Sequence, residues 1–313
     1  MNREKQYTSS ANKLLGHMYR LEMGKKNKWY PINLQLSPTE ICNLNCSFCS
    51  VKERGAETLD YDKMISALDD FIELGIKSVE ITGGGDPTMY PYINDLISYL
   101  HYKDISIGLI TNGIELSKYV KKQSLKKLKW LRISLNGIDQ GFTYKDIPKI
   151  KGTLGFSYVW NKTSDVKKLK QIYKLAKINK VKYVRIVPDC LIPKEQLRLR
   201  GEVNSLVEKL KMTDMIFVQT KNYQVYPNRC WIGALKPFLY TDGYIYQCSA
   251  VALYNRKFDK KWRICHMNDI KKVWPNNYKP INPKMCEEGK CFYCEHNKIL
   301  DEMQQKVDHH GFI

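Results

Sequence analysis

The stretch INLQLSPTEICNLNCSFC, residues 32–49, places three cysteines shortly after a run that alternates apolar and polar residues. This alternation over residues 32–37 predicts a strand. Cys42, Cys46 and Cys49 follow with three and then two residues between them, a spacing at which one loop can wrap an iron–sulfur cluster. Three thiolates on a four-iron cube leave one iron open to another ligand. A zinc knuckle and a chance cluster are the alternatives, but zinc sites normally close with four ligands, and no fourth Cys or His is nearby in sequence.

Similar strand patterns recur along the chain, and amphipathic stretches separate most of them. In residues 61–75, Met64, Leu68 and Phe71 recur at helical spacing and Gly75 suits a helix end. Repeated β–α units indicate a parallel sheet with right-handed crossovers. They favour an α/β fold with a partial (β/α)6 barrel. The expected strands are residues 32–37, 77–82, 105–111, 130–135, 154–160 and 183–188. The expected helices are residues 61–75, 92–102, 117–128 and 163–179, the last opened by a Ser/Thr cap.

The β–α rhythm stops after residue 220, where aromatic residues and cysteines become frequent. Residues 239–248, LYTDGYIYQC, predict a hairpin with Asp-Gly at its turn. A small core closed by metal suits so short a segment. We therefore expect an N-terminal extension over residues 1–31 with one helix at 12–23, a barrel over 32–220 and a small cysteine-rich hairpin and helix domain over 221–313.

The composition of the 313 residues is that of a globular protein, with 43% apolar and 27% charged residues. No uninterrupted apolar stretch has the length of a membrane span, and the first ten residues lack the apolar core of a signal peptide. We therefore expect a soluble, cytoplasmic protein with no membrane partner. In such a reducing compartment, clustered cysteines bind metal or carry redox chemistry more often than they form disulfides.

The cysteine motif resembles the hallmark of the radical S-adenosylmethionine (radical SAM) superfamily, CxxxCx(aromatic)C, with Phe48 at the aromatic position. The resemblance covers residues 32–220. It implies a partial TIM-like barrel, with S-adenosylmethionine bound at the open iron of a 4Fe–4S cluster that Cys42, Cys46 and Cys49 hold. One electron then cleaves S-adenosylmethionine to methionine and a 5′-deoxyadenosyl radical, which abstracts a hydrogen atom from the substrate. The resemblance also implies an external one-electron reductant such as flavodoxin or ferredoxin.

Further residues at predicted strand ends agree with this resemblance. The family has a Gly-Gly-Glu motif against the amino group of S-adenosylmethionine. At the corresponding place, after the second predicted strand, this chain has Gly83-Gly84-Gly85-Asp86, with Asp86 instead of Glu. Glycines there let the backbone approach a ligand closely. Catalytic sites of barrels lie at these carboxyl ends. Turn chemistry is the alternative for Asn112 and Ser134. The resemblance assigns cofactor contacts to Phe48, Gly83, Gly84, Gly85, Asp86, Asn112, Ser134, Asn136 and Val187.

Asp189 and Cys190 follow the sixth predicted strand. The carboxylate of Asp189 is a candidate general base on the substrate side, and the alternative is a solvated loop residue. The thiol of Cys190 is a candidate for radical quenching, and the alternative is a small buried apolar side chain.

The C-terminal cysteines resemble the twitch domain, the short form of the SPASM extension of radical SAM enzymes. Its pattern, Cys-x(9–15)-Gly-x4-Cys and a later pair, fits Cys230, Gly243 and Cys248 followed by Cys291 and Cys294. The resemblance implies a second 4Fe–4S cluster on these four cysteines, and a zinc site is the alternative. Cys265 and Cys286 are spare in this assignment, and Cys286 is an alternative to Cys291. His266, His309 and His310 are expected to be surface residues.

The substrate is open to several interpretations. The net charge is +19, and residues 111–200 hold 22 Lys and Arg against 6 Asp and Glu. Such a surplus favours a nucleic acid base or nucleotide derivative as substrate, although it equally describes the solvated face of Lys-rich helices. Peptide modification and the two-electron oxidation of a small alcohol or amine are the other enzymatic alternatives. A non-enzymatic metal-binding module is the most distant one. Aromatic residues near the predicted barrel mouth are Tyr144, Phe156, Tyr158 and Trp160.

Overall fold

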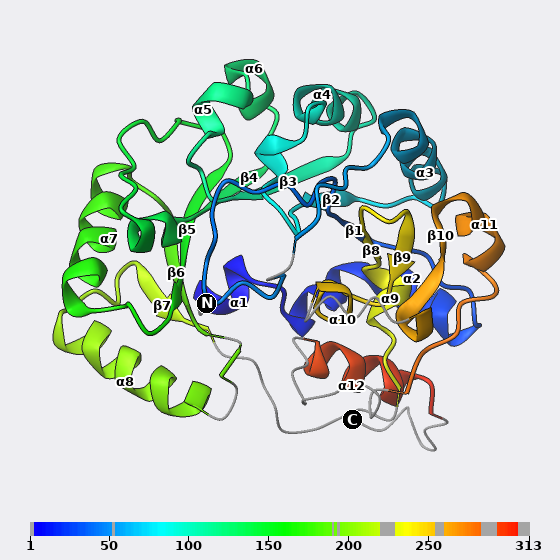
Figure 1. Ribbon diagram of the computed structural model, residues 1–313. Coiled ribbons are helices and arrows are strands. Elements are labelled where there is room, and N and C mark those ends of the chain that lie inside the picture. Colours follow the sequence, from blue (N-terminus) through cyan, green and yellow to red (C-terminus); the bar gives the residue numbers. More distant parts are fainter. Residues whose placement is uncertain are drawn as a thin grey trace.

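The structure is a computed structural model, and it describes residues 3–51, 54–189, 191–192, 195–219, 229–253, 260–282 and 293–305 (Figure 1). Its strands form one sheet in the order β10-β9-β8-β1-β2-β3-β4-β5-β6-β7, in which β1 to β7 are parallel. The sheet curves into an open, partial barrel with helices on its outer face (Figure 1). The predicted α/β partial barrel is therefore confirmed.

All six predicted strands are present, and the structure adds a short seventh, β7. The sequence pattern does not indicate this strand, because three residues carry too little alternation to be recognised. The parallel strands are β1 (Asn33–Leu36), β2 (Ser78–Ile81), β3 (Ser106–Thr111), β4 (Trp130–Ser134), β5 (Thr153–Trp160), β6 (Tyr183–Pro188) and β7 (Ile216–Val218).

Helices cover the outer face of these strands, and two of them show how the local sequence sets their ends. The N-terminus of α3 is capped by Asp60, whose carboxylate accepts from Lys63 N at 2.9 Å, and Gly75 follows its end with a φ of +80°. Asp165 caps α7, rather than the Ser or Thr that the sequence suggested. The predicted helix at 117–128 is split in two. The outer helices are α3 (Tyr61–Glu73), α4 (Ile93–Tyr102), α5 (Leu116–Tyr119), α6 (Lys122–Leu125), α7 (Val166–Ile178) and α8 (Gln196–Lys209).

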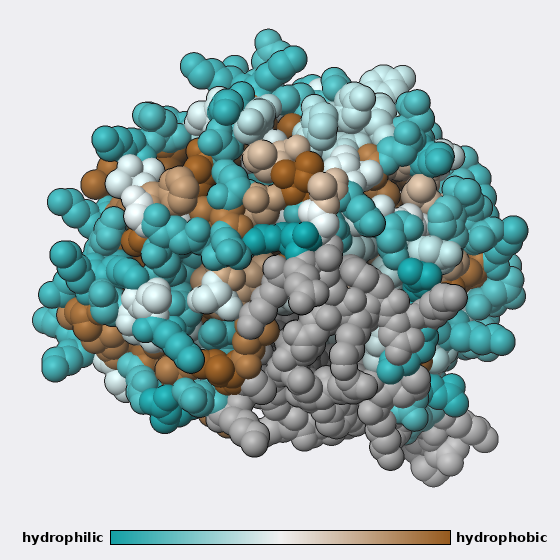
Figure 2. Space-filling model, viewed as in Figure 1, coloured by the Kyte–Doolittle hydropathy of each residue, from teal (hydrophilic) through white to brown (hydrophobic). Residues whose placement is uncertain are grey.

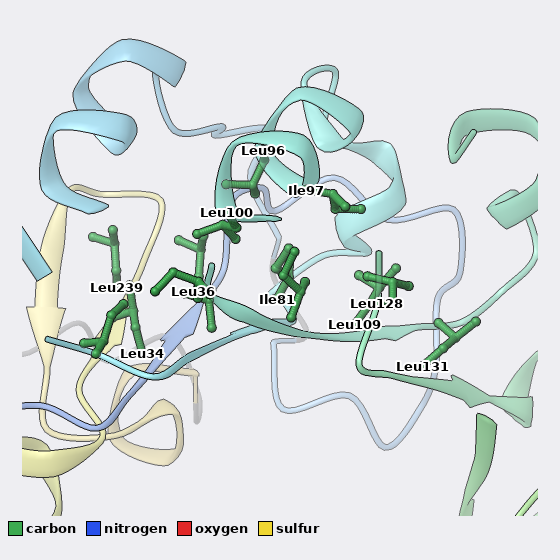
Figure 3. Close-up of a cluster of buried hydrophobic side chains, with 14 of the residues drawn as sticks. Leu34, Leu36, Ile81, Leu96, Ile97, Leu100, Leu109, Leu128, Leu131 and Leu239 are labelled. Carbon is green, nitrogen blue, oxygen red and sulfur yellow. The ribbon is translucent and has the colours of Figure 1, made fainter. Parts of the chain in front are cut away.

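The hydrophobic core lies between the strands and this outer layer. Figure 3 shows strand leucines such as Leu36 and Leu109 close to the apolar face of α4, which carries Leu96, Ile97 and Leu100. All five side chains are buried. Since side chains alternate along a strand, every residue between two such core residues faces the inside of the barrel.

Residues beyond 229 extend the same sheet past β1. β8 (Phe238–Leu239) pairs with β1 in parallel, and β9 (Tyr244–Tyr246) pairs with β8 and β10 (Arg263–His266) in antiparallel. The predicted hairpin is confirmed, with Gly243 at a φ of +76° in its turn. The remaining elements of this part are α9 (Ile232–Leu235), α10 (Ser249–Leu253), η6 (Lys260–Trp262), η7 (Met267–Asp269), α11 (Ile270–Val273) and α12 (Cys294–Met303).

The N-terminal residues form α1 (Arg3–Tyr7), the 3-10 helix η1 (Ala11–His17) and α2 (Met18–Lys25), instead of the single helix expected at 12–23. The ring of Tyr7 stacks on Tyr183 of β6 with centroids 4.5 Å apart, and α12 packs on η1. The ring of Trp29 stacks on Trp231 at 4.9 Å. The N-terminal segment therefore contacts both β6 and the C-terminal part of the chain.

No helix in the described residues is both long enough and apolar enough to cross a membrane. Hydrophilic side chains dominate the outer helices on the face drawn in Figure 2. Among them, Lys121, Lys122 and Lys126 are exposed, and the helix α6 is held against α4 on the outside of the barrel by the hydrogen bond of Ser124 Oγ to Asn94 Oδ1.

Candidate active site

The predicted site residues follow the carboxyl ends of parallel strands, which meet at one edge of the barrel. We name the connection between β1 and α3 the cysteine loop; it carries Cys42, Cys46 and Cys49. It contacts the connection after β2, where Gly84 N donates to Ser37 Oγ at 2.8 Å, and the connection after β3, where Asn112 Nδ2 donates to Asn43 Oδ1 at 2.7 Å. The structure thus brings together segments that lie far apart in the sequence.

The three cysteines of the loop are half-buried neighbours. Cys49 N donates to the carbonyl of Cys46 at 3.0 Å, which closes a tight turn. Burial, reinforced by the adjacent thiols of Cys49 and Cys42, raises the pKa of Cys46 to about 11. Burial also raises the pKa of Cys42. A metal bound to these thiols would instead lower their pKa values, because a coordinating metal deprotonates a thiol.

Two side-chain amides point at the thiols. Gln140 Nε2 lies 3.4 Å from Cys46 Sγ, and its Oε1 accepts from Asn45 N at 3.3 Å. Asn112 Nδ2 lies 3.8 Å from Cys42 Sγ. N–H groups near sulfur stabilise its negative charge and tune iron–sulfur sites. Gln140 lies in η3 (Leu135–Gln140), after β4, and no feature of the sequence singled it out.

The donor set fits an iron–sulfur cube better than a single metal ion. In the part of the chain that the structure describes, no three Cys, His, Asp or Glu side chains are gathered closely enough to hold one ion. Ligands of one zinc ion must converge on a point, whereas each thiolate of a cube binds a different iron and stands farther from the others. The three neighbouring thiols, with amide donors beside two of them, therefore suit a cube in which each thiolate binds a different iron.

Hydrogen bonds fix the cysteine loop from behind. The guanidinium of Arg54 donates to Leu44 O at 2.6 Å, across the loop. The buried carboxylate of Glu40 accepts from Gly55 N at 2.8 Å and, on its other oxygen, from the hydroxyl of Tyr240 at 2.5 Å. Residues of the C-terminal hairpin therefore help to position the loop that carries the cysteines.

The glycine run after β2 packs directly on the cysteine loop. A Cβ at Gly85 would lie 2.2 Å from Ile41 O, and one at Gly84 would lie 2.6 Å from the hydroxyl of Tyr240. Gly85 N donates to Thr39 O at 3.0 Å. These glycines therefore allow one loop to approach another closely, and the approach to a ligand stays a prediction.

Asp86 is a buried carboxylate, 3% exposed, with both oxygens occupied by protein donors. It accepts from Thr88 N and Oγ1 at 3.0 and 2.6 Å, from Thr111 Oγ1 at 2.9 Å, and from Asn112 N at 2.6 Å. Burial raises the pKa of this carboxyl, against the effect of those hydrogen bonds. The side chain of Asp86 thus ties the end of β3 to the glycine run.

Comparison with known proteins agrees with this geometry. The sequence model of the radical SAM superfamily matches residues 36–187, which run from the last residue of β1 into β6. Residues 36–187 are a radical SAM domain. A radical SAM domain implies S-adenosylmethionine and one 4Fe–4S cluster as cofactors.

Among curated proteins, the radical SAM domain is similar to the GTP 3',8-cyclase of Staphylococcus aureus. The identity is 36% over 118 residues, which cover 34% of this chain and 34% of the cyclase. The chain thus matches about a third of the length of these curated relatives. Among solved structures, Streptococcus suis SuiB bound to S-adenosylmethionine has a TM-score of 0.60 at 15% identity, covering 96% of this chain and 81% of SuiB. SuiB bound to its precursor peptide SuiA has a TM-score of 0.56 at 16% identity, covering 86% and 71%. At these identities the likeness to SuiB concerns the fold alone.

Asn136, which follows β4 in the radical SAM domain, is buried and connects the end of β4 to β5 through its side-chain amide. Its Oδ1 accepts from Val159 N at 2.8 Å, and its Nδ2 donates to Val159 O and to Asp139 Oδ2, each at 3.0 Å. The side chain is 1% exposed. Ser134 is half-buried, and its Oγ lies 3.5 Å from Asn136 Oδ1. The amide of Asn136 therefore holds β4 to β5, and Ser134 lies beside it.

At the end of β6, Val187 is half-buried and faces the inside of the barrel, because its neighbour Ile186 belongs to the core. Asp189 is 7% exposed, which excludes the solvated loop residue considered from sequence. Its backbone N–H donates to Trp160 O at 3.0 Å, and its Oδ1 accepts from Leu191 N at 2.8 Å. Cys190 lies outside the described residues, and Phe48 lies in the cysteine loop.

Three of the four cysteines assigned to a second cluster are described. Cys230 packs in a small apolar cluster with Ile232 and Tyr293, and Cys248 packs against it. Cys294 follows Tyr293 directly and opens α12. Asn297 Nδ2 lies 3.5 Å from Cys230 Sγ, an arrangement like that of Gln140 at the first site. Cys291 and Cys286 lie outside the described residues, as do His309 and His310. Cys265 lies apart from the others on β10, and burial raises its pKa to about 12.

Proposed function

We propose that the protein is a radical SAM enzyme that acts on a nucleotide derivative. The observation that carries the proposal is the geometry of Cys42, Cys46 and Cys49 at the end of β1, with the amides of Asn112 and Gln140 beside two of the thiols. The bound cluster and S-adenosylmethionine would supply a 5′-deoxyadenosyl radical that takes a hydrogen atom from the substrate.

The protein's own residues would hold and shield these cofactors. The cysteines provide three thiolates, and Gln140 and Asn112 donate to two of them. The backbone of Gly83, Gly84 and Gly85 would contact the amino group of S-adenosylmethionine. Asp86 would keep that backbone in place, since its carboxylate already accepts hydrogen bonds from Thr88 N and Asn112 N. Residues proposed against the rest of the cofactor are Phe48, Asn112, Ser134, Asn136 and Val187.

We further propose a twitch-like domain over residues 221–313, with a second 4Fe–4S cluster on Cys230, Cys248, Cys291 and Cys294. The grouping of Cys230 and Cys248 beside Tyr293 supports it. Four thiolates would close the coordination of that cluster, so its role would be electron transfer or structure rather than substrate ligation. An external reductant such as flavodoxin or ferredoxin would supply the electron. Asp189 is proposed as a general base at the same mouth.

The choice of a nucleotide derivative rests on the relative that is a GTP 3',8-cyclase. The lysines of α6 give no support to a nucleic acid polymer, because this helix packs on α4 on the outer side of the barrel. Peptide modification stays the second candidate. The likeness to SuiB concerns fold, so it does not favour a peptide substrate for this chain.

The first experiment is anaerobic reconstitution with iron and sulfide, followed by reduction with dithionite in the presence of S-adenosylmethionine. We expect about eight iron atoms per chain, four per cluster, and formation of 5′-deoxyadenosine. Replacing Cys42, Cys46 and Cys49 by Ala should halve the iron and abolish 5′-deoxyadenosine. Replacing Cys230 and Cys248 by Ala should remove the other half. Cleavage of S-adenosylmethionine by the triple variant would contradict the assignment, and zinc in place of the second cluster would contradict the twitch proposal.

The substrate is tested by incubating the reduced protein with nucleoside triphosphates, with RNA and DNA, and with peptides. A mass shift that depends on S-adenosylmethionine and reductant in the nucleotide arm is the expected result. A shift in the peptide arm alone would overturn the nucleotide proposal while leaving the radical SAM proposal intact.

A further inference from the structure

Two arginines of the barrel strands point toward the inside of the barrel. On β4, Leu131 and Ile133 belong to the core under the outer helices, so Arg132 between them faces inward. On β6, Val184 and Ile186 belong to the same core, so Arg185 also faces inward. Charged side chains inside a barrel are costly unless they are paired.

Within the residues that the structure describes, neither guanidinium pairs with a carboxylate. The Nε atoms of Arg132 and Arg185 are buried and have no hydrogen-bond partner. In the described part of the chain, neither residue makes an ion pair or a side-chain hydrogen bond. Arg132 makes one cation–π contact, with the ring of Trp130, whose centroid lies 5.7 Å from Cζ. Buried polar groups are almost always paired in folded proteins, so two buried Nε groups without a partner on the same inner face call for an explanation.

Glu80, the carboxylate that attracts Arg185 most strongly, is already paired with other residues. Glu80 of β2 accepts from Gln35 Nε2 at 3.0 Å and forms an ion pair with Lys236 Nζ at 3.3 Å. Burial, followed by repulsion from Arg132, lowers the pKa of Arg185 to about 9, and the attraction of Glu80 and of Glu4 on α1 does not offset it. The interior therefore holds positive charge that the described residues do not neutralise.

The strand register places this charge next to the candidate active site. Ser134 pairs with Ser157, and Ser157 pairs with Arg185, so Arg185 and Ser134 stand at the same level of the sheet. Arg132 pairs with Gly155, two residues earlier on β5. Gly155 has no side chain, and the ring of Tyr183, its partner on β6, packs over it. Arg185 thus stands at the level of Ser134, which is proposed to face S-adenosylmethionine, and Arg132 stands two residues before Ser134 on β4.

We propose that Arg132 and Arg185 bind an oxyanion of the substrate, a phosphate or a carboxylate, inside the barrel. The proposal rests on the proposed function, because it takes the barrel interior as the substrate site. A guanidinium is planar and matches a phosphate or carboxylate through two parallel N–H donors. The oxyanion would neutralise the interior charge and satisfy the unpaired Nε groups. Binding at this depth would orient the substrate toward the cysteine loop.

The test measures binding of two probes, tripolyphosphate and tricarballylate, to the reconstituted protein by anaerobic titration calorimetry at low salt. The variants are Arg132→Met and Arg185→Met, which remove the charge at similar volume. The matched control is Arg198→Met on α8, because Arg198 is exposed and already paired with Glu195 and Glu202. We expect each interior variant to weaken binding about tenfold or more, and the control to change it less than twofold. Binding of tripolyphosphate alone would assign a phosphate-bearing substrate, and binding of tricarballylate alone a carboxylate.

Thermal unfolding without probe separates this role from a structural one. Removing an interior cation that has no carboxylate partner should leave the unfolding temperature of Arg132→Met and Arg185→Met equal to that of the parent protein, or raise it. Failure of the parent protein to bind either probe, or equal binding by parent and interior variants, would overturn the proposal. Formation of 5′-deoxyadenosine is followed in the same samples. Its absence from the parent protein would overturn the proposed function instead, whatever the calorimetry shows.

Discussion

The hydroxyl of Tyr240, just after β8, donates to Glu40 Oε1 at 2.5 Å and so joins the C-terminal hairpin to the cysteine loop. Both side chains are buried, with Tyr240 fully so and Glu40 1% exposed. The other carboxylate oxygen of Glu40 accepts from Gly55 N. One carboxylate therefore links two segments that are 200 residues apart in the sequence.

Replacing Tyr240 by Phe should destabilise the protein, because the ring stays but a buried carboxylate loses a donor. A hydrogen bond to a charged group contributes about 1.5–3 kcal/mol. The free energy of unfolding in urea measures the loss. Tyr102→Phe is the control, since Tyr102 is 83% exposed, and it should change stability by less than about 0.5 kcal/mol. Equal effects of the two substitutions would show that the hydroxyl of Tyr240 contributes nothing to folding.

Gln140→Ala should weaken the hold of the protein on the iron of the first site, because the amide beside Cys46 Sγ is lost. Groups that orient or hydrogen-bond metal ligands are typically worth 10–100-fold in metal affinity. Iron retained after timed exposure to a chelator measures this effect. Gln123→Ala, an exposed residue of α6, is the control. Iron loss at the rate of the parent protein would mean that the 3.4 Å contact has no role at the site.

Gly85→Ala should be severely destabilising, by about 3 kcal/mol or more, because the new Cβ would stand 2.2 Å from the carbonyl oxygen of Ile41. Gly201→Ala on α8 is the matched comparison. Nothing lies within 4 Å of a Cβ there, so the change should stabilise the protein by up to about 1 kcal/mol. Thermal unfolding of the two variants gives opposite signs if the glycine run packs on the cysteine loop as described. A well-tolerated Gly85→Ala would show that the loops can separate.

Asp139 predicts a dependence of stability on pH. Burial alone would raise the pKa of its carboxyl, but hydrogen bonds from Asn136, Lys168, Tyr158 and Asn161 outweigh burial and hold the pKa below its ordinary value of 3.8. Because the folded pKa is depressed, the ionised group stabilises the fold fully above the unfolded pKa. That contribution is lost as the pH falls below about 4, through the lower folded pKa.

The measurement is the unfolding free energy of the parent protein minus that of Asp139→Asn, taken from pH 6 to pH 3. The difference should be constant, about 3 kcal/mol, above pH 4 and should shrink below it. Asp62→Asn, at an exposed position in the first turn of α3, should show a far smaller difference. A difference that grows as the pH falls would contradict the sign derived from this network.

The sequence predicted the barrel because most of its strands are recognisable as β-branched runs with core residues on one face. Leu131 and Ile133 on β4 are an example. It did not predict β7, which is too short to alternate. Nor did it predict that the C-terminal hairpin joins the same sheet, because pairing of β8 with β1 depends on a contact between residues such as Leu36 and Leu239 that are distant in sequence.

At the candidate site, spacing alone identified the cysteines, because the residues of one loop are close in sequence as well as in space. Gln140 and Tyr240 were missed, since each reaches the loop from a distant part of the sequence and neither belongs to a recognisable motif. Glu40 lies in the loop itself, but its partner Tyr240 is 200 residues away, so no local pattern indicates its role. Asn136 illustrates the opposite case. It was singled out as a cofactor contact, and the structure shows its amide joined to both backbone groups of Val159.

The parallel pairing of β8 with β1 also bears on solubility. β1 is a short strand whose Leu34 and Leu36 are fully buried, and β8 covers the edge that it would otherwise expose. An uncovered apolar strand edge is a template for pairing with other chains. A protein shortened to end at residue 220 would keep all seven parallel strands of the barrel but would leave this edge open. It should therefore aggregate, even though it retains every cysteine of the first site.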